Sequence, residues 1–308
     1  MNETMLDIAL LGCGGTMPLP KRWLTALLAS YQGKMILIDC GEGTQVTMKM
    51  LGWGFKSIEA ICFTHYHADH VTGLPGLLFA IANAGRTDPL LIIGPPGLTE
   101  VVRGMTVIAP YLPYELQTIE LSAQEPTVSK IVGVTVRTLP VEHTVPCLGY
   151  TLEIERGRKF NPVRASELEI PVPFWGHLQK GEEVTYNGRT FTPDMVLGPP
   201  RKGLKVAYCT DTRPTEELVE FIRGADLFIG EGMYGDPESL PKAEEHKHML
   251  FEEAAMLALR GGVKELWLTH YSPSLSEPEQ FIDVARRIFP QTKLGEDRMT
   301  ISLVFEKD

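Results

Sequence analysis

Short apolar segments recur along the whole chain and alternate with segments of helical periodicity. Each has about four to eight residues, is rich in Ile, Val, Leu and aromatic residues, and is bounded by Gly, Pro or Asp, as expected of buried strands. They lie at residues 6–12, 35–41, 60–65, 89–94, 132–139, 150–155, 205–211, 226–232, 265–270 and 299–306. Because such alternation builds sheets covered by helices, the chain is predicted to adopt an α/β fold.

Helices are predicted between these strands. Residues 71–85 carry an apolar stripe, with Pro75 suited to the first turn and Gly85 to the C-terminal cap. The stripe consists of Leu74, Leu77, Leu78 and Ile81, which recur at the spacing of one helix face. Further helices are predicted within residues 214–224, 248–262 and 277–290.

The chain is long enough for one large domain, residues 1–308, made of two βα halves at about 1–150 and 200–308. Residues 155–200 differ from both halves, because they are rich in Pro and Gly and mix charges with aromatic residues. This stretch is long for a structureless loop and could form a projecting arm inserted between the halves. An ordinary irregular connection is the alternative, and the sequence leaves both open.

Histidines concentrate at the end of the predicted strand 60–65, in the run FTHYHADHVTG. His65 and His67 are two positions apart, so in an extended chain both side chains point the same way. Asp69 and His70 follow at the predicted strand-to-helix turn. Because zinc binds imidazole nitrogens and carboxylate oxygens, this density of ligands predicts a metal centre.

Three further candidates stand at the ends of later strands. His143 follows the strand 132–139, Asp211 ends the strand 205–211 and His270 ends the strand 265–270. Taken singly, each has an ordinary alternative as a capping aspartate or a turn histidine. Sites in α/β folds gather beyond the carboxyl ends of the strands, so together they supply enough ligands for two metal ions. Such a set suits zinc, and it also accepts manganese or iron.

This order of residues resembles the signature of the metallo-β-lactamase superfamily over almost the whole chain. The resemblance implies an αββα four-layer sandwich, in which two mixed β-sheets are flanked by helices. It implies that one metal ion is held by His65, His67 and His143. It implies that the other is held by Asp69, His70 and His270, that Asp211 bridges the two, and that Asp39 supports the ligands from behind.

Three stretches further resemble the ribonuclease Z family: LLGCGGTMPLP, IDCGEGTQ and EEHKHMLFEEAA. The resemblance implies that His248 in the last stretch is catalytic and that Glu231 orients it. His248 stands just before a predicted helix, whose N-terminus favours anions such as phosphate. A protonated imidazole held by a carboxylate could donate to a leaving oxygen, with Asp69 as ligand and proton acceptor. The alternative is an exposed histidine at a helix start, as we expect for His246.

The parts that would grip RNA depart from the family pattern. A Pro-x-Lys-x-Arg loop senses the tRNA 3′ end in the family, whereas here Pro200 and Lys202 are followed by Leu204. The resemblance therefore leaves the rejection of mature CCA ends open. The substrate-binding candidates are Arg156, Arg158, Lys159 and Lys202, beside Phe160, Phe174 and Trp175, which could stack on bases. His177 lies in the same region and is not expected to bind metal.

Together the resemblances imply a metal-dependent phosphodiesterase, an endoribonuclease that cleaves the 3′ trailer from precursor tRNA. They imply an attacking hydroxide generated by two zinc ions, and a homodimer. One rival is a hydrolase of small phosphodiesters, thioesters or lactones with the same fold and ligands. Another is a metal-loaded RNA-binding scaffold without activity. His248 and Glu231 separate the first rival from the nuclease, and the intact ligand set argues against the second.

Composition limits the remaining classes of function. The formal net charge is −10, so RNA binding would need a local basic patch. The Gly-rich opening stretch lacks G-x-G-x-x-G spacing, so no nucleotide cofactor is expected. The 5 cysteines form no C-x-x-C, which fits a reducing cytoplasm and argues against a cysteine-type zinc site. A signal peptide and a long apolar span are both missing from the sequence, so we expect a cytoplasmic protein without membrane contact.

Overall fold

The computed structural model describes residues 5–306, so the two ends of the expected domain 1–308 lie outside the described residues. The chain divides into two compact units. The larger unit runs up to Glu153 and continues from Lys205 to Val304. The smaller unit comprises Ile154–Leu204 together with the C-terminal residues from Phe305.

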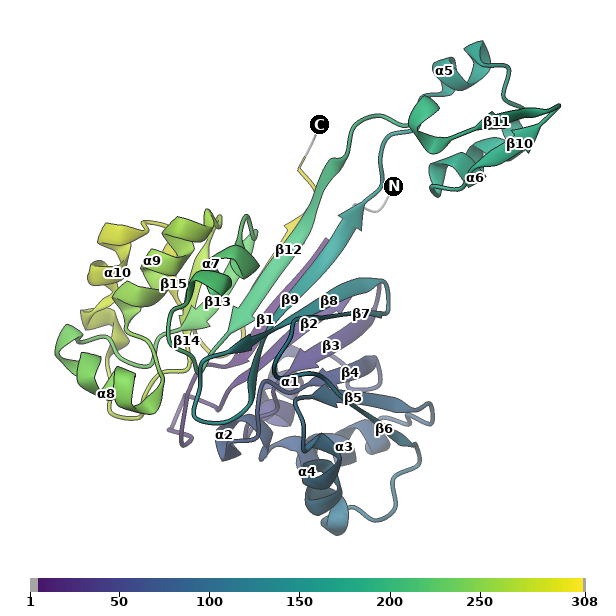
Figure 1. Cartoon of the computed structure of the whole chain (residues 1–308). Helices are drawn as coiled ribbons and strands as arrows, with labels where there is room; N and C mark the ends of the chain where they lie inside the picture. Colours follow the sequence, from purple (N-terminus) through teal and green to yellow (C-terminus); the bar gives the residue numbers. More distant parts are fainter. Residues whose placement is uncertain (1–4, 307–308) are drawn as a thin grey trace. The chain divides into compact units, whose positions relative to one another are not determined.

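The first sheet of the larger unit has the strand order β16-β1-β2-β3-β4-β5-β6 (Figure 1). Its strands are β1 (Met5–Gly12), β2 (Ala26–Tyr31), β3 (Lys34–Ile38), β4 (Ile58–Cys62), β5 (Leu90–Gly94), β6 (Leu116–Glu120) and β16 (Met299–Val304). β16, β1, β2 and β3 pair antiparallel, whereas β3 to β6 pair parallel. The β2–β3 hairpin turns at Gln32 and Gly33, whose φ angles of 51° and 77° suit a tight hairpin turn.

The second sheet has the order β15-β14-β13-β12-β9-β8-β7. Its strands are β7 (Thr127–Ile131), β8 (Val134–Val141), β9 (Cys147–Arg156), β12 (Arg201–Cys209), β13 (Leu227–Glu231), β14 (Leu266–Thr269) and β15 (Thr292–Leu294). β12 to β15 pair parallel and β7 to β9 pair antiparallel, so both sheets are mixed.

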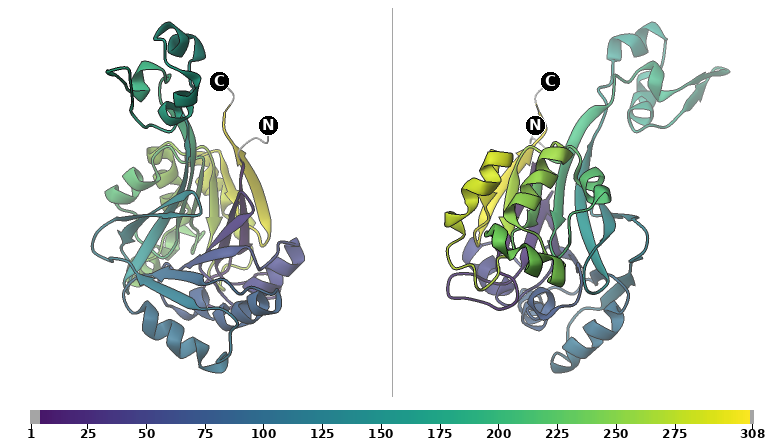
Figure 2. Two further views of the ribbon diagram at one scale, coloured as in Figure 1. Left: turned by 90° about the vertical axis from the view of Figure 1, so that its right-hand side faces the viewer. Right: turned by 60° about the vertical axis from the view of Figure 1, so that its left-hand side comes forward.

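Helices cover the outer faces of both sheets, α1–α4 beside the first and α7, α9 and α10 beside the second (Figure 1, Figure 2). They are α1 (Thr44–Leu51), α2 (Ala68–Val71), α3 (Leu74–Asn83), α4 (Leu98–Met105), α7 (Glu216–Ile222), α8 (Leu240–His246), α9 (Phe251–Gly261) and α10 (Ile282–Ile288). The stripe predicted for α3 is fully buried against the first sheet. The predicted αββα sandwich of two mixed sheets is confirmed.

Each predicted strand and helix overlaps an observed one, but several elements escaped prediction. β6, β7 and β15 are edge strands, and their short, mostly polar sequences give no apolar run. None of the helices between residues 5 and 306 has the length and apolar character that crossing a bilayer requires. All 5 cysteines are buried free thiols.

The smaller unit contains the region for which an arm or an irregular connection was expected. It holds α5 (Pro162–Glu167), α6 (Trp175–Gln179) and the hairpin of β10 (Val184–Tyr186) with β11 (Arg189–Phe191). These elements bury a core of their own, formed by Ala165, Ile170, Leu178, Val184, Phe191 and Val196. The region is therefore a folded unit with regular structure. Its use as an arm stays a prediction.

Candidate metal centre

Several predicted ligands, and Asp39 as their predicted support, lie where strands end. Asp39 follows β3, His65 and its neighbours follow β4, Asp211 follows β12 and His270 follows β14. Asp39, Asp211 and His270 have positive φ angles of 58°, 56° and 61°. Residues other than glycine rarely adopt this conformation, which costs about 1–3 kcal/mol and clusters at functional sites. The backbone at these three strand ends is thus shaped to aim side chains into one place.

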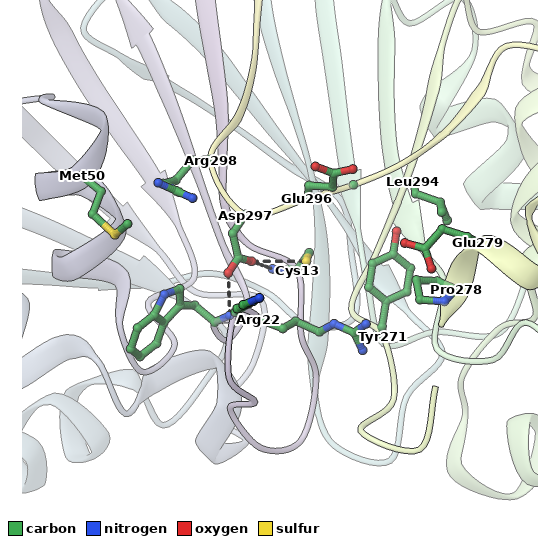
Figure 3. A pocket seen from close by; sticks show the side chains of 13 residues that line it. Cys13, Arg22, Met50, Tyr271, Pro278, Glu279, Leu294, Glu296, Asp297 and Arg298 are labelled. Carbon is green, nitrogen blue, oxygen red and sulfur yellow. Dashed lines mark hydrogen bonds between the residues drawn. The ribbon is translucent and has the colours of Figure 1, made fainter. Parts of the chain in front are cut away.

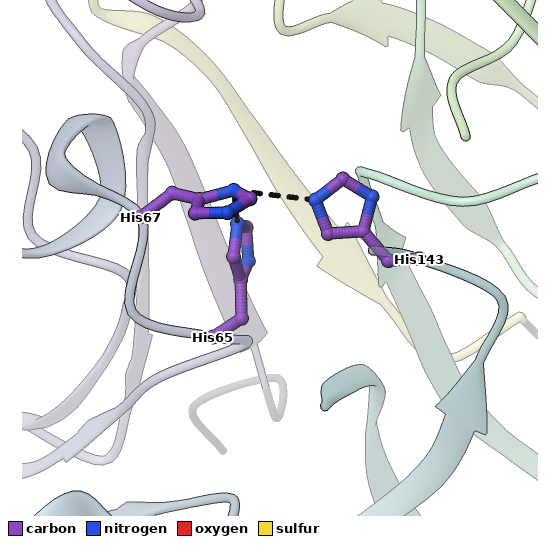
Figure 4. Close-up of side chains that lie close together, drawn as sticks. All are labelled: His65, His67 and His143. Carbon is purple, nitrogen blue, oxygen red and sulfur yellow. Dashed lines mark hydrogen bonds between the residues drawn. The ribbon is translucent and has the colours of Figure 1, made fainter. Parts of the chain in front are cut away.

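Three imidazoles converge from two segments of the chain (Figure 4). Nε2 of His65 lies 3.0 Å from Nδ1 of His67, and Nε2 of His143 lies 3.3 Å from the same atom. One nitrogen of each ring lies within 4.8 Å of the others. That spacing is compatible with three ligands of a single ion, each about 2.0–2.1 Å from it.

A second group joins Asp69, His70 and His270. Nε2 of His70 lies 3.2 Å from Nε2 of His270, which in turn lies 3.2 Å from Oδ2 of Asp69. The ligand atoms of this group also lie within 4.8 Å of one another. All three side chains are buried, so the donor atoms face one another instead of solvent.

Asp211 lies against both groups. Its Oδ2 lies 3.2 Å from Nε2 of His70 and 3.3 Å from Nε2 of His270, and it forms a further possible group with His65 and His70. This buried oxygen nevertheless accepts no hydrogen bond. A buried carboxylate oxygen without a hydrogen bond is costly unless a cation neutralises it. The residues present therefore fit a metal centre.

Charge is concentrated at this site. Burial works against the charged form of His270, but Asp211 and Asp69 outweigh it and raise the pKa of His270 to about 10. Burial also opposes ionisation of Asp69, but the hydrogen bond from His270 and the charge of His70 hold the pKa of Asp69 well below its usual range. Asp69 and Asp211 thus carry negative charge at a buried position. Protonated imidazoles can neutralise this charge, and a bound divalent cation can neutralise it instead.

Asp39 contacts His70, one of the predicted ligands, and its supporting role stays a prediction. Its Oδ2 accepts from Nδ1 of His70 at 2.8 Å, which leaves Nε2 of that ring directed at the site. Its Oδ1 accepts the backbone N–H of Thr64 at 2.8 Å, and the Thr64 hydroxyl also contacts both carboxylate oxygens. Thr64 could not be predicted from the sequence, because a threonine at the end of an apolar strand carries no signal of its own.

His248 lies beside the metal-binding groups and is oriented by Glu231. Nδ1 of His248 lies 2.6 Å from Oε1 of Glu231 and 3.7 Å from Oδ1 of Asp211. Burial opposes the charged imidazole, but the charge and hydrogen bond of Glu231 raise the pKa of His248. Distance alone also permits a metal group of Asp211, Glu231, His248 and His270.

The segment carrying His248 is anchored by a residue that sequence reasoning missed. Arg213 donates to the carbonyl oxygen of His248 and forms a forked pair with Glu253. Glu253 also accepts the backbone N–H of Leu250, the residue that caps α9. α9 therefore begins at Phe251, inside the helix predicted within residues 248–262, and His248 lies just before it, as predicted.

The basic candidates all belong to the smaller unit. Arg158 donates to the carbonyl of Gly198 at 2.5 Å and pairs with Asp194 at 2.6 Å, so its guanidinium is engaged within the unit. Arg156 donates to the carbonyl of Glu306 at 2.8 Å and lies over the ring of Phe305. Lys159 and Lys202 also have interaction partners.

The aromatic candidates of this unit contribute to its own packing. Phe160 and Trp175 pack together with ring centroids 5.3 Å apart, and Phe174 joins them against the unit's core. His177 pairs with Glu182 at 2.6 Å and joins none of the possible metal groups in the described part of the chain. Leu204, at the position of the family's arginine, is buried.

A four-layer sandwich with histidines and aspartates converging at strand ends defines a metal-binding protein of the metallo-β-lactamase fold. Solved structures share this fold. The metallo-beta-lactamase fold protein YhfI from Bacillus subtilis gives a TM-score of 0.69 at 19% identity, covering 97% of this chain and 100% of that one. The short form of human tRNase Z (ELAC1) gives 0.67 at 24% identity, covering 96% and 98%.

Sequence comparison then gives the family. Residues 6–103 match the family of the anti-Pycsar protein Apyc1. Ribonuclease Z of Clostridium acetobutylicum is 54% identical over 309 residues, covering 99% of this chain and 100% of the relative. Ribonuclease Z of Clostridium kluyveri is 53% identical over 303 residues, covering 98% and 100%. The chain belongs to the ribonuclease Z family and is a hydrolase.

Proposed function

We propose that the chain is an endoribonuclease that removes the 3′ trailer from precursor tRNA. Full-length identity above 50% to proteins named ribonuclease Z supports this substrate. The observation that carries the proposal is the pair of His248 and Glu231, whose Nδ1 and Oε1 atoms lie 2.6 Å apart. A hydrolase that acts on a phosphodiester must protonate a leaving alkoxide, and this pair lies beside the metal-binding residues.

We propose that two zinc ions complete the site, with manganese or iron as alternatives. Two ions, when bound, supply Lewis-acid activation of water and of a phosphate oxygen. The ligands of the first would be His65, His67 and His143. The ligands of the second would be Asp69, His70 and His270, with Asp211 between the two groups.

The side chains around the site divide the proton transfers. His248 donates its proton to the departing 3′ oxygen of the RNA, and the Glu231 carboxylate keeps the imidazole charged and oriented. Asp69 accepts the proton of the attacking water. Its Oδ2 accepts the backbone N–H of Thr16 at 2.6 Å and lies 3.2 Å from His270, so its orientation is fixed before substrate binds.

We propose that the smaller unit binds the tRNA as an arm and that the protein acts as a homodimer, as the family resemblance implies. Arg156, Lys159 and Lys202 remain the substrate-binding candidates. Arg158 has a different role in this proposal, because its guanidinium holds Gly198 and Asp194 together. A reducing, cytoplasmic location stays a prediction.

The test uses zinc-loaded protein, a precursor tRNA with a 3′ trailer and, in parallel, a small chromogenic phosphodiester. A single cut at the start of the trailer, abolished by a chelator and by His248→Ala, is the expected result. Turnover of the small diester with an intact precursor would contradict the tRNA proposal. It would favour the alternative, a hydrolase of small phosphodiesters, thioesters or lactones. Loss of hydrolysis on metal removal, with RNA binding retained, would show that the metal serves catalysis and would contradict the inactive RNA-binding scaffold.

A further inference from the structure

The loop between β1 and β2 forms part of the metal centre through its backbone. The N–H of Thr16 donates to Oδ2 of Asp69 at 2.6 Å. Gly15 lies directly against His270, because a Cβ added to Gly15 would stand 2.7 Å from Cε1 of that ring. The N–H of Gly15 also donates to the carbonyl of Tyr271 at 3.0 Å. A shift of this loop would therefore move the backbone groups that contact Asp69 and His270.

One distant carboxylate holds both ends of the same loop (Figure 3). Oδ1 of Asp297 accepts the backbone N–H of Cys13 at 3.1 Å and contacts its thiol at 3.3 Å. Oδ2 of Asp297 accepts the backbone N–H of Trp23 at 2.8 Å. Asp297 lies between β15 and β16, far along the chain, so its carboxylate ties both ends of the loop to a distant segment.

The loop needs such anchoring. Thr16 and Lys21 have φ angles of 66° and 67°, a conformation that only a well-fixed environment maintains in residues other than glycine. Arg22 gives a second anchor, because its guanidinium donates to the carbonyl of Leu275 at 2.7 Å and lies over the Tyr271 ring. A pocket of about 540 Å³ lined in part by Asp297, Trp23 and Tyr271 leaves open space on this side of the loop. Backbone hydrogen bonds from Gly14 to Trp23 and from Tyr271 to Cys13 hold the same ends of the loop, and Asp297 adds a side chain that joins the two ends.

We propose that Asp297 is a positioning residue for the metal centre. Its carboxylate fixes the ends of the Cys13–Trp23 loop, and the loop in turn fixes Asp69 and His270. The effect expected on catalysis rests on the proposed cleavage of precursor tRNA, whereas the effect expected on metal affinity rests only on the proposed metal centre.

The test compares Asp297→Asn with Gly15→Ala and with the control Asp226→Asn. Asparagine has the same size as aspartate. Its N–H₂ group cannot accept a hydrogen bond, so one of the two backbone N–H groups loses its acceptor. Gly15→Ala disturbs His270 directly from within the loop and leaves the Asp297 carboxylate in place. Asp226 is a buried carboxylate that accepts the N–H of Lys205 at 2.9 Å and pairs with Lys264. Neither partner belongs to the predicted metal centre, so we expect Asp226→Asn to affect stability alone.

Zinc affinity is measured by competition with a chromophoric chelator, and kcat and KM are measured on precursor tRNA and on the small diester. We expect Asp297→Asn and Gly15→Ala each to weaken zinc binding by about tenfold or more. We expect kcat to fall by a similar factor with little change in KM, and Asp226→Asn to leave both unchanged. Zinc affinity and kcat of Asp297→Asn equal to those of Asp226→Asn would overturn the proposal.

Two further outcomes are separable. If Asp297→Asn does not fold, Gly15→Ala alone decides whether the loop acts on His270: unchanged zinc affinity in that variant contradicts the proposal. If the wild-type protein leaves precursor tRNA intact, the proposed function fails, but the comparison of zinc affinities still decides the role of Asp297.

Discussion

Glu231 fixes both the side chain and the backbone at His248. Its Oε1 lies 2.6 Å from Nδ1 of His248, and its Oε2 accepts the backbone N–H of Met249 at 2.8 Å. Glu231 is fully buried at the end of β13, so the orientation of the imidazole is set by the sheet itself. In the proton-donor role that we propose for His248, an imidazole held in this way needs no rearrangement when the substrate binds.

The first prediction concerns His248→Ala. Removing a general acid lowers rates by about 10²–10⁴-fold, and we expect a fall of that size in kcat on precursor tRNA. The zinc content, measured by atomic emission, should stay that of the wild type. His246→Ala is the matched control, because His246 is exposed two positions away and should retain full activity. Loss of zinc from His248→Ala would show that the ring is a ligand and not the proton donor.

The second prediction concerns metal removal and stability. Asp211 has a buried oxygen without a hydrogen bond, and Asp69 and His270 are buried beside it. A ligand that binds only the folded state at about a hundred times its Kd adds about 2.7 kcal/mol of stability. We therefore expect a chelator to lower the unfolding midpoint and excess zinc to restore it. His177→Ala, in the smaller unit, should leave this difference unchanged, and an unchanged midpoint in wild-type protein would contradict metal binding at the site.

The third prediction concerns Arg86, a buried cation remote from the site. Its guanidinium donates to the carbonyls of Asp88, Lys56, Ile58 and Pro89 and to the carboxylate of Glu59. Arg86→Met leaves several of these buried acceptors unpaired, so we expect a loss of about 3 kcal/mol in the free energy of unfolding. Arg137→Met, which breaks a largely exposed pair with Glu153, should cost about 1 kcal/mol or less.

Arg86 also affects the pH dependence of stability. Burial opposes ionisation of Glu59, but hydrogen bonds from Lys34 and Arg86 lower the pKa of Glu59 below its usual value. A depressed carboxyl pKa stabilises the fold above the pKa of the unfolded chain, and this contribution is lost as the pH falls through the folded value. Urea unfolding measured between about pH 6 and pH 3 should therefore show that the free energy of unfolding falls less steeply with pH in Arg86→Met than in the wild type. If the free energy of unfolding falls equally with pH in both proteins, the interaction of Arg86 with Glu59 does not contribute to the pH dependence.

Much of the site could be predicted because its ligands follow parallel strands. A strand's apolar run is visible in the sequence, and its last residues must reach the same edge as those of its neighbours. Asp211 and His270 follow parallel strands of one sheet and could be placed together for this reason, and their side chains lie 3.3 Å apart. His65 follows a strand of the other sheet, so its place beside Asp211 was implied by the family resemblance.

The supporting residues could not be predicted. Asp297 contacts Cys13 across 284 positions, and Thr64 and Arg213 are common residue types in ordinary sequence surroundings. Their roles arise from tertiary hydrogen bonds, which leave no periodic pattern. The edge strands β6, β7 and β15 could not be predicted for a related reason: pairing on one side only and exposure to solvent allow polar sequences such as that of β6.

The last prediction separates the two units by substrate. Leu178 is fully buried in the core of the smaller unit, where truncation to alanine costs about 2–5 kcal/mol. If that unit binds tRNA, Leu178→Ala should lower kcat/KM on precursor tRNA while turnover of the small diester stays near that of the wild type. Limited proteolysis should then cut within residues 154–204 first.

Leu218→Ala in α7 is the matched control, because Leu218 is equally buried but lies in the larger unit. We expect it to lower overall stability and to leave the ratio of the two activities unchanged. Equal loss of both activities in Leu178→Ala would mean that the smaller unit supports the fold of the metal centre, and its role as an RNA-binding arm would have to be abandoned. A selective loss on precursor tRNA cannot arise from the metal-binding residues, since both substrates need them, and would therefore assign recognition of the RNA to residues 154–204.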